Sequence, residues 1–325
     1  MKKHFLYCCF LAGVLSLPNS CSSELKSDID EGRVESFSVS LDPLIFEDDL
    51  GSLTRSSIEK DEGGYYQVWT EGDVIGVFPN TGSQIEFAIQ PAYYNQRSAV
   101  FDGGGWALRT GYQYAAYYPF NYDYKDKSAL PVNFIGQKQV GNNNMAHINR
   151  YNFFVSKNAI VAESSSLEFG VQFVGHLCRF IFTMPEAGNF TKLRIKSSAI
   201  DFAKTATMDI SGADPIMSDV KTARKVILEL EGISTAAADE VITLYMWLCP
   251  RDLTGTVLTA EVVSDAGKVY RTTLMSKNYA ANAATSFTRP NATYTLTYVG
   301  TDSESDDDDV EGDSSVTITD PGTWE

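Results

Sequence analysis

The side chains that most often carry catalysis are few and scattered in this sequence. The 325 residues contain 3 histidines, and only His147 and His176 lie beyond residue 20. No H-E-x-x-H, C-x-x-C, G-x-S-x-G or G-x-x-x-x-G-K pattern marks a metal ligand set, a nucleophile or a phosphate loop. His176 lies inside an alternating apolar run, where a hydrogen-bonded core or edge histidine is expected rather than a general base. The sequence therefore predicts no enzyme, no catalytic residue and no cofactor.

Two other sets of side chains could bind a ligand. Residues 302–313 (DSESDDDDVEGD) carry eight acids, but they lack the D-x-[DN]-x-[DN]-G spacing that shapes a calcium loop. No metal site is predicted there, and mutual repulsion predicts a disordered acidic linker over residues 301–313. Some tyrosines could stack on sugars, although most tyrosines in a strand-rich chain lie at strand faces and rims. The tyrosines concerned are Tyr93, Tyr94, Tyr122 and Tyr124.

The first residues read as an export signal. Lys2 and Lys3 precede an apolar run over residues 5–17 that is too short for a permanent membrane helix. We therefore assign residues 1–20 to a signal peptide. Ser20 followed by Cys21 resembles the lipobox of bacterial lipoproteins, which implies lipidation of Cys21 and a palmitate-type anchor in the outer membrane. An ordinary secretory signal is the alternative.

The segment behind Cys21 is small, polar and acidic. Residues 21–36 resemble the tether that directs Bacteroidetes lipoproteins to the cell surface, so a surface location is expected. Loss of residues 1–20 removes Lys2 and Lys3 from 26 basic residues and none of the 42 acidic ones, which changes the formal net charge from −16 to −18. Nucleic acid is therefore excluded as an expected partner.

Cysteine usage adds little chemistry. Cys8 and Cys9 leave with the signal peptide, and Cys21 is used by the lipid. Cys178 and Cys249 lie in apolar, strand-like runs, so two buried thiols that act as small hydrophobic residues are expected. A disulfide between them is the alternative, because their separation in space is unknown.

The remaining chain alternates between apolar and polar residues at the strand period, and no long amphipathic helix is predicted. The predicted strands are FSVSL (37–41), YYQVW (65–69), DVIGVF (73–78), IEFAI (85–89), YAAYY (114–118), LEFGVQF (167–173), CRFIFTM (178–184), TKLRIKS (191–197), KVILELE (225–231), VITLYMWL (241–248), TVLTAEVV (256–263), VYRTTLM (269–275) and TYTLTYV (293–299). Short strands with Gly- and Asp-rich turns between them favour an all-β fold built of β-sandwiches. The length suggests two domains, 37–160 and 161–300, with a polar boundary near residues 156–166.

Several stretches resemble the fimbrillin family of Bacteroidetes, whose members are surface lipoproteins related to fimbrial subunits. They are VWTEGDVIGVF (68–78), AAYYPF (115–120), LEFGVQFVGHLCRFIFTM (167–184) and NATYTLTYV (291–299), in the family's order. The resemblance implies two transthyretin-like β-sandwich domains in tandem. It also implies a structural or adhesive pilus subunit at the cell surface.

The same resemblance implies partners and a mode of assembly. Other fimbrial subunits would bind by strand exchange, and a host or bacterial surface receptor is a further possible partner. The first alternative is a monomeric surface lipoprotein that binds glycans for nutrient capture, and the second is a hydrolase of unrecognised type.

Two sites of assembly are expected. In fimbrillin relatives an arginine-directed cut releases the first strand, and Arg55 lies in a polar stretch after FSVSL (37–41), although an intact loop is the alternative. Residues 314–325 are the candidate donor strand, with Val316 and Ile318 on one face and Trp324 beyond them. The alternative is a tail that folds back on its own domain or stays disordered.

Overall fold

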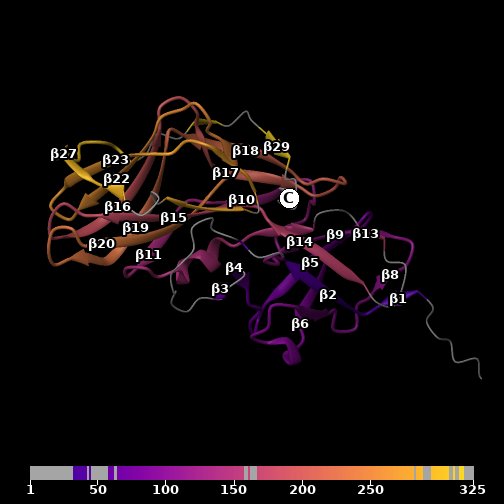
Figure 1. Ribbon diagram of the computed structural model, residues 1–325. Helices are drawn as coiled ribbons and strands as arrows, with labels where there is room; N and C mark the ends of the chain where they lie inside the picture. The colour runs from indigo at the N-terminus through magenta and orange to yellow at the C-terminus, as the bar shows by residue number, and fades with distance from the viewer. Residues whose placement is uncertain are drawn as a thin grey trace, which may run out of the picture. The chain divides into compact units, whose positions relative to one another are not determined.

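Runs that alternate between apolar and polar residues form paired strands along the chain (Figure 1). The computed structural model describes residues 32–41, 44, 58–61, 64–156, 160–161, 167–281, 283–287, 294–306, 310–311 and 315–317. In these ranges the helical elements are two short 3₁₀ turns, η1 (Pro91–Tyr93) and η2 (Ala146–Tyr151). The all-β prediction is therefore confirmed.

The first sheet has a strand order that closes on itself. Its strands, in order of pairing, are β12 (Phe154–Ser156), β14 (Glu168–Phe173), β2 (Ser36–Leu41), β7 (Ala99–Asp102), β6 (Ile85–Ile89), β5 (Val74–Pro79), β9 (Gln113–Tyr118) and β13 (Ile160–Val161). β12 also pairs with β9, so the order from β12 to β9 forms a ring. Two small ladders accompany it: β1 (Arg33–Val34) with β8 (Leu108–Arg109), and β3 (Ile58–Asp61) with β4 (Gly64–Gln67).

The stretch WTEGDVIGVF owes its composition to the packing around β5. Trp69 is fully buried, and its ring meets Phe101, Tyr118 and Phe154 edge-on at 5.0–5.6 Å. The Asp73 carboxylate closes the turn by accepting a hydrogen bond from the Thr70 N–H (2.7 Å) and another from the Tyr118 hydroxyl (2.8 Å). Burial and the nearby Asp73 charge raise the pKa of Tyr118. These residues therefore stabilise one end of the first core.

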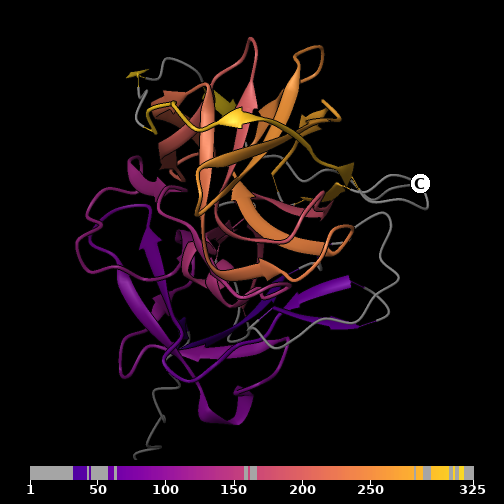
Figure 2. The ribbon, with the colours of Figure 1, turned by 90° about the vertical axis from the view of Figure 1, so that its left-hand side faces the viewer.

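Two further sheets enclose the second core. The six-stranded sheet has the order β11 (Lys138–Val140), β19 (Lys225–Thr235), β16 (Gly188–Ser197), β22 (Leu258–Ser264), β23 (Lys268–Leu274) and β27 (Thr297–Thr301). The other sheet contains β20 (Val241–Leu248), β15 (His176–Thr183), β25 (Ala283–Phe287) and β26 (Tyr294–Thr295). Leu193 of β16 and Phe180 of β15 belong to one buried cluster between them. In Figure 2 these strands run in colour from the magenta of β11 through pink and orange to the yellow of β27.

A long hairpin and the C-terminal strands make a separate sheet. β17 (Phe202–Asp209) pairs with β10 (Leu130–Asn133) on one side and β18 (Ile216–Ala223) on the other. β28 (Val310–Glu311) and β29 (Ser315–Thr317) both pair with β18. A last ladder joins β21 (Arg251–Asp252) to β24 (Asn278–Tyr279).

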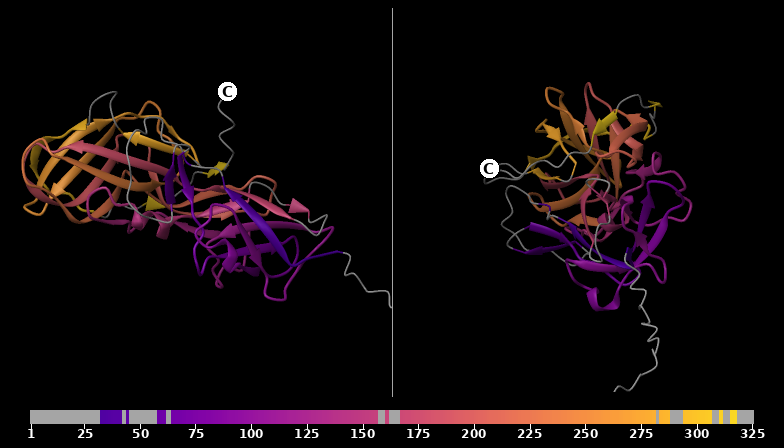
Figure 3. Two further views of the ribbon diagram at one scale, coloured as in Figure 1. Left: turned by 60° about the horizontal axis from the view of Figure 1, so that its bottom comes forward. Right: turned by 90° about the vertical axis from the view of Figure 1, so that its right-hand side faces the viewer.

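The sheets do not divide at residue 160, where the sequence suggested a domain boundary. β14 lies after that boundary but pairs with β2, which lies before it. β10 and β11 lie before the boundary but pair with β17 and β19. Residues Gly32–Glu325 accordingly form one unit by their contacts. The indigo-to-magenta and orange-to-yellow strands can be followed in Figure 3.

The sequence predicted a disordered linker over residues 301–313, but the structure orders the first part of it, residues 301–306. Thr301 closes β27, and residues 302–306 lie against the six-stranded sheet, where ion pairs hold their side chains. The mutual repulsion of the acids is offset there by basic residues of β16. In the part of the chain that the structure describes, no helix has the length and apolar character needed to cross a membrane.

Candidate functional site

Strand β2 occupies a slot between two strands from distant parts of the chain. It runs parallel to β14, with Val39 opposite Phe169, and antiparallel to β7, with Phe37 opposite Phe101. The Ser38 N–H also donates to the Leu167 carbonyl at 2.9 Å. β2 is thus hydrogen-bonded on both edges, and its removal would leave unpaired backbone groups on both neighbours.

The floor of this slot is aromatic. Phe37 is 2% exposed, and its ring lies 4.7 Å from the rings of Phe87 and Phe169 and 6.1 Å from that of Phe101. Val39, on the same face of β2, is 1% exposed. Ser38 between them and the flanking Ser36 and Ser40 point the other way at the two-residue strand period. The slot therefore selects a strand that reads polar, apolar, polar, apolar.

The C-terminal strand lies elsewhere in this structure. β29 pairs with the edge of β18, with Val316 opposite Met217 and Thr317 opposite Ile216 (Figure 1). Residues 315–317 thus pair with their own chain in this structure, and the donor role of the tail stays a prediction. Ile318 and Trp324 lie outside the described residues, and so do Cys21 and Arg55.

The edge of β20 is closed by amide side chains instead of a strand. The Gln137 amide accepts from the Trp247 N–H (2.8 Å) and donates to the Trp247 carbonyl (2.7 Å). The Gln139 amide accepts from the Tyr245 N–H (2.8 Å) and donates to the Thr243 carbonyl (2.9 Å). We call these two residues the amide ladder. It occupies the backbone groups that another strand would need for pairing.

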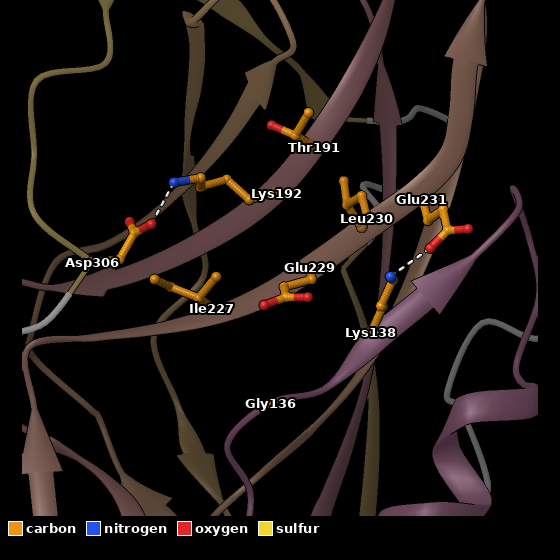
Figure 4. A pocket seen from close by; sticks show the side chains of 9 residues that line it. All are labelled: Gly136, Lys138, Thr191, Lys192, Ile227, Glu229, Leu230, Glu231 and Asp306. Carbon is orange, nitrogen blue, oxygen red and sulfur yellow. Dashed lines mark hydrogen bonds and ion pairs between the residues drawn. The ribbon is translucent and has the colours of Figure 1, made fainter.

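A shallow groove of about 450 Å³ lies where β11, β19 and β16 meet (Figure 4). Lys138 pairs with Glu231 at 2.5 Å on one side of it, and Lys192 pairs with Asp306 at 2.5 Å on the other. Glu229 lies between these two pairs. Because its cations already have carboxylate partners, the groove does not offer a strong site for a small anion.

Both described histidines contact backbone carbonyls. His176 is 1% exposed, its Nδ1 lies 2.7 Å from the Ala280 carbonyl, and burial lowers the pKa of the imidazole to about 4. The Nε2 of His147 lies 2.8 Å from the Tyr245 carbonyl, and burial lowers the pKa of that imidazole as well. Among the described residues, no group of three or more His, Cys, Asp or Glu is placed to hold a metal ion.

Both described thiols are buried and unpaired, as the sequence favoured. Cys178 belongs to the second core and Cys249 to the first. Burial raises the pKa of each thiol, so neither is a reactive thiolate at neutral pH.

The tyrosines proposed as a sugar platform do not form one set. Tyr93, Tyr94 and Tyr124 are half-buried and pack against the first core. Tyr122 is 74% exposed, but the Lys125 ammonium lies 3.6 Å from the centre of its ring. Trp106 is 68% exposed and was not singled out from the sequence.

Sequence reasoning also missed the amide ladder and Arg194. Gln137 and Gln139 lie at strand spacing in QKQ, but nothing local shows that they bind a distant backbone. Arg194 carried a detectable signal. The basic residues of KLRIK (192–196) and the acids of DSESD (302–306) both recur at every second position.

Comparisons with known proteins support the fold. A scan against protein-family models found no match, and no curated protein sequence matched either. Solved structures do match, and among them are two that are described as a "putative cell adhesion protein". One, from Bacteroides ovatus, has a TM-score of 0.52 at 14% identity and covers 85% of this chain and 99% of its own. The other, from Bacteroides uniformis, has a TM-score of 0.50 at 12% identity and covers 72% of this chain and 93% of its own. This chain therefore shares its β fold with these two Bacteroides proteins, and at these identities the likeness is one of fold.

Proposed function

We propose that this protein is a cell-surface structural or adhesive subunit that assembles with other subunits by exchanging a strand. The observation that carries the proposal is the correspondence between β2 and the tail. SFSVS (36–40) and SVTIT (315–319) share one alternation, in which Val316 would replace Phe37 and Ile318 would replace Val39. The fold shared with cell adhesion proteins supports the same class of function.

The slot geometry gives the exchange a physical basis. Loss of β2 would bare the edges of β14 and β7 and the rings of Phe87, Phe101 and Phe169. A tail strand from another subunit would restore both ladders and bury its own apolar side chains. Each large apolar side chain buried in this way contributes roughly 1.5–3 kcal/mol, and the ladder sets the register.

The tail must first leave its own chain. β28 and β29 hold it on β18 through pairings of two and three residues. Short edge pairings of this kind are marginal by themselves. In this proposal, the subunit before exchange has β2 in the slot and residues 315–317 paired in cis.

The tail is tested most directly by its removal. A variant that lacks residues 314–325 should keep the circular dichroism spectrum of the monomer and lose polymers in electron microscopy. A finer pair of variants separates sequence from length: Val316→Ser with Ile318→Ser should abolish polymers, whereas Thr317→Ser with Thr319→Ser should not. Polymers that persist in the deletion variant would rule the tail out as donor.

The lipid anchor at Cys21 is part of the proposal. Attachment to the outer membrane would place the subunit at the cell surface, and the acidic residues 21–36 would space it from the lipid. Cys21→Ala should move the protein from the detergent phase to the aqueous phase on detergent partitioning. Unchanged partitioning would refute lipidation.

Glycan capture by a monomer is the second candidate function, and Trp106 is the observation in its favour. Its exposed ring stands on the glycine-rich loop after β7 and could stack on a sugar. Binding of the monomer to surface polysaccharides that Trp106→Ala abolishes, together with polymers that are absent from native surface material, would favour this function.

A further inference from the structure

The six-stranded sheet carries a row of cations on its outer face. Lys192, Arg194 and Lys196 follow one another at the strand period on β16, and we call them the cationic row. Leu193 and Ile195 alternate with them and are buried in the second core. The row therefore lies on the side of the sheet that faces away from the core. Lysine and arginine side chains on such a side normally reach water.

Arg194 does not reach water, because an acidic segment covers it. Arg194 is fully buried, and its Nη1 lies 2.9 Å from the Glu261 carboxylate on β22. Its Nη2 lies 3.2 Å from Asp302 and 3.0 Å from Asp306. A buried guanidinium needs such partners, since an uncompensated buried charge is strongly destabilising.

The covering acids are Asp302, Glu304 and Asp306, which we call the acidic clasp. Asp306 also pairs with Lys192 at 2.5 Å, as Figure 4 shows, and Glu304 pairs with Lys196. Burial acts to raise the pKa of the Asp302 and Asp306 carboxyls, but the charges and hydrogen bonds of the cationic row outweigh it and hold each pKa below its ordinary value. Each clasp acid thus meets at least one cation of the row.

Backbone groups fix the same segment. The Asp302 N–H donates to the Gly267 carbonyl at 2.8 Å, in the turn between β22 and β23. The Lys225 ammonium of β19 donates to the Ser305 carbonyl. Residues 302–306 are therefore attached to several strands of the sheet and not to a single side chain.

The clasp lies between β27 and the weakly paired tail. The ladders of β28 and β29 on β18 are two and three residues long. With the clasp closed, only the residues from 307 to 309 separate a fixed point from β28. With the clasp open, the free segment begins after Thr301, the last residue of β27, and closing a longer loop costs more conformational entropy.

We propose that the acidic clasp on the cationic row is an electrostatic latch, which keeps the C-terminal tail on its own subunit and thereby controls when the tail becomes available to a second copy of this chain. The inference rests on the proposed donor role of the tail. The latch itself is a property of the single subunit, so it is measurable without assembly.

Hydrogen exchange on the monomer tests the latch. In Asp302→Asn with Glu304→Gln and Asp306→Asn, amides of β28, β29 and β18 should exchange about tenfold faster, because several charge-assisted contacts are lost together. The matched control neutralises three exposed acids elsewhere: Glu71→Gln, Glu86→Gln and Asp214→Asn. The control should leave the exchange of these amides unchanged.

Salt gives a second readout without substitution. In the unaltered protein, raising the salt from about 0.1 M to about 1 M shortens the range of electrostatic attraction and should speed exchange in the same segments. Equal exchange in the clasp variant, its control and the unaltered protein at both salt concentrations would overturn the latch.

Assembly kinetics then separate the latch from the proposed function. Polymers should form sooner in the clasp variant than in its control. Suppose that the tail amides exchange hydrogen faster in the clasp variant and that polymers survive deletion of residues 314–325. This result would support the latch and refute the tail as donor. Unchanged hydrogen exchange of the tail amides would refute the latch whether or not polymers form.

Discussion

Gly76 is the glycine of the IGVF stretch, and its role is to admit a tyrosine ring. It lies opposite Tyr117 across the β5–β9 ladder, and a Cβ at this position would overlap that ring. Tyr117 is fully buried, and its hydroxyl donates to the Gln84 side chain at 2.5 Å, so the ring cannot move away easily. Gly76→Ala should lower the free energy of unfolding by about 1–3 kcal/mol through overpacking.

Chemical denaturation measures this effect, and Gly170→Ala is its matched control. Gly170 lies in β14, and a Cβ there would have no heavy atom within 4 Å. The control should change stability by no more than about 0.5 kcal/mol. Equal effects of the two variants would show that the Tyr117 ring has room to shift.

His176 makes stability depend on pH below neutrality. Its pKa is lowered from the model-compound value of 6.5 to about 4, first by burial and then, in part, by the Lys277 charge, against the opposing hydrogen bond to Ala280. Between these two pH values His176 is protonated in the unfolded chain and neutral in the folded chain. The free energy of unfolding therefore falls as pH decreases from 6.5 towards 4. The loss is on the order of 3 kcal/mol.

Denaturation midpoints across that pH range test the assignment. His176→Asn keeps a side-chain donor near the position of Nδ1 for the Ala280 carbonyl but removes the titrating group. The variant should lose most of the decline between pH 6.5 and 4 that the unaltered protein shows. An unchanged decline would assign the pH dependence to other groups.

Single residues were predicted well where their role follows from local pattern. His176 and the two buried cysteines stand in alternating apolar runs, and burial follows from that pattern alone. Arg194 could not be assigned in the same way, because a cation in an alternating strand normally marks a solvated face. Its burial depends on an acidic segment more than one hundred residues further along the chain.

At the scale of elements, the amide ladder closes the edge of β20 that faces away from β15. Gln137→Met with Gln139→Met keeps side-chain length but leaves the Tyr245 N–H and both backbone groups of Trp247 on β20 without their amide partners, while the Thr243 carbonyl keeps the Asn143 N–H. Each unsatisfied buried group costs about 1–3 kcal/mol. The bared edge should also pair between subunits, which size-exclusion chromatography with light scattering would detect as dimers.

Gln139→Met alone is an informative control for the ladder. It removes the acceptor of the Tyr245 N–H and a donor to the Thr243 carbonyl but keeps both Gln137 contacts with Trp247, so its effect should be intermediate. A double methionine variant that stays monomeric with unchanged stability would contradict a protective role.

Most strands were predictable from period, and their partners were not. IEFAI (85–89) and VITLYMWL (241–248) match β6 and β20 residue for residue. The β17–β18 hairpin was missed, because FAKTATMD and IMSDVKTA interleave alanine, threonine and charge and give weak alternation. The parallel pairing of β2 with β14 joins positions about 130 residues apart, and no local signal specifies such a contact.

At the scale of the whole molecule, linear order was a poor guide to organisation. A polar stretch near residue 160 resembles a linker, yet strands on either side of it cross into each other's sheets. Polar composition shows that a segment is a loop, but the packing of the strands around it decides whether it also separates domains. The tandem transthyretin-like arrangement therefore stays a prediction.

The last prediction concerns maturation after Arg55. Arg55 lies outside the described residues, between Leu44 and the start of β3 at Ile58. A cut there would release β1 and β2 and remove Val34, Phe37, Val39 and Leu44 from the first core, in which each is at most 2% exposed. The trimmed subunit should be less stable until another strand fills the slot.

N-terminal sequencing of subunits recovered from surface polymers should therefore begin at Ser56, and Arg55→Ala should block both trimming and assembly. A synthetic peptide of residues 314–325 should raise the melting temperature of the trimmed subunit. The same peptide with Val316→Asp and Ile318→Asp should not, because a charged side chain cannot enter the aromatic slot without a large desolvation cost. Assembled subunits that retain residues 37–50 would refute release of β2, since the slot would then still hold its own strand.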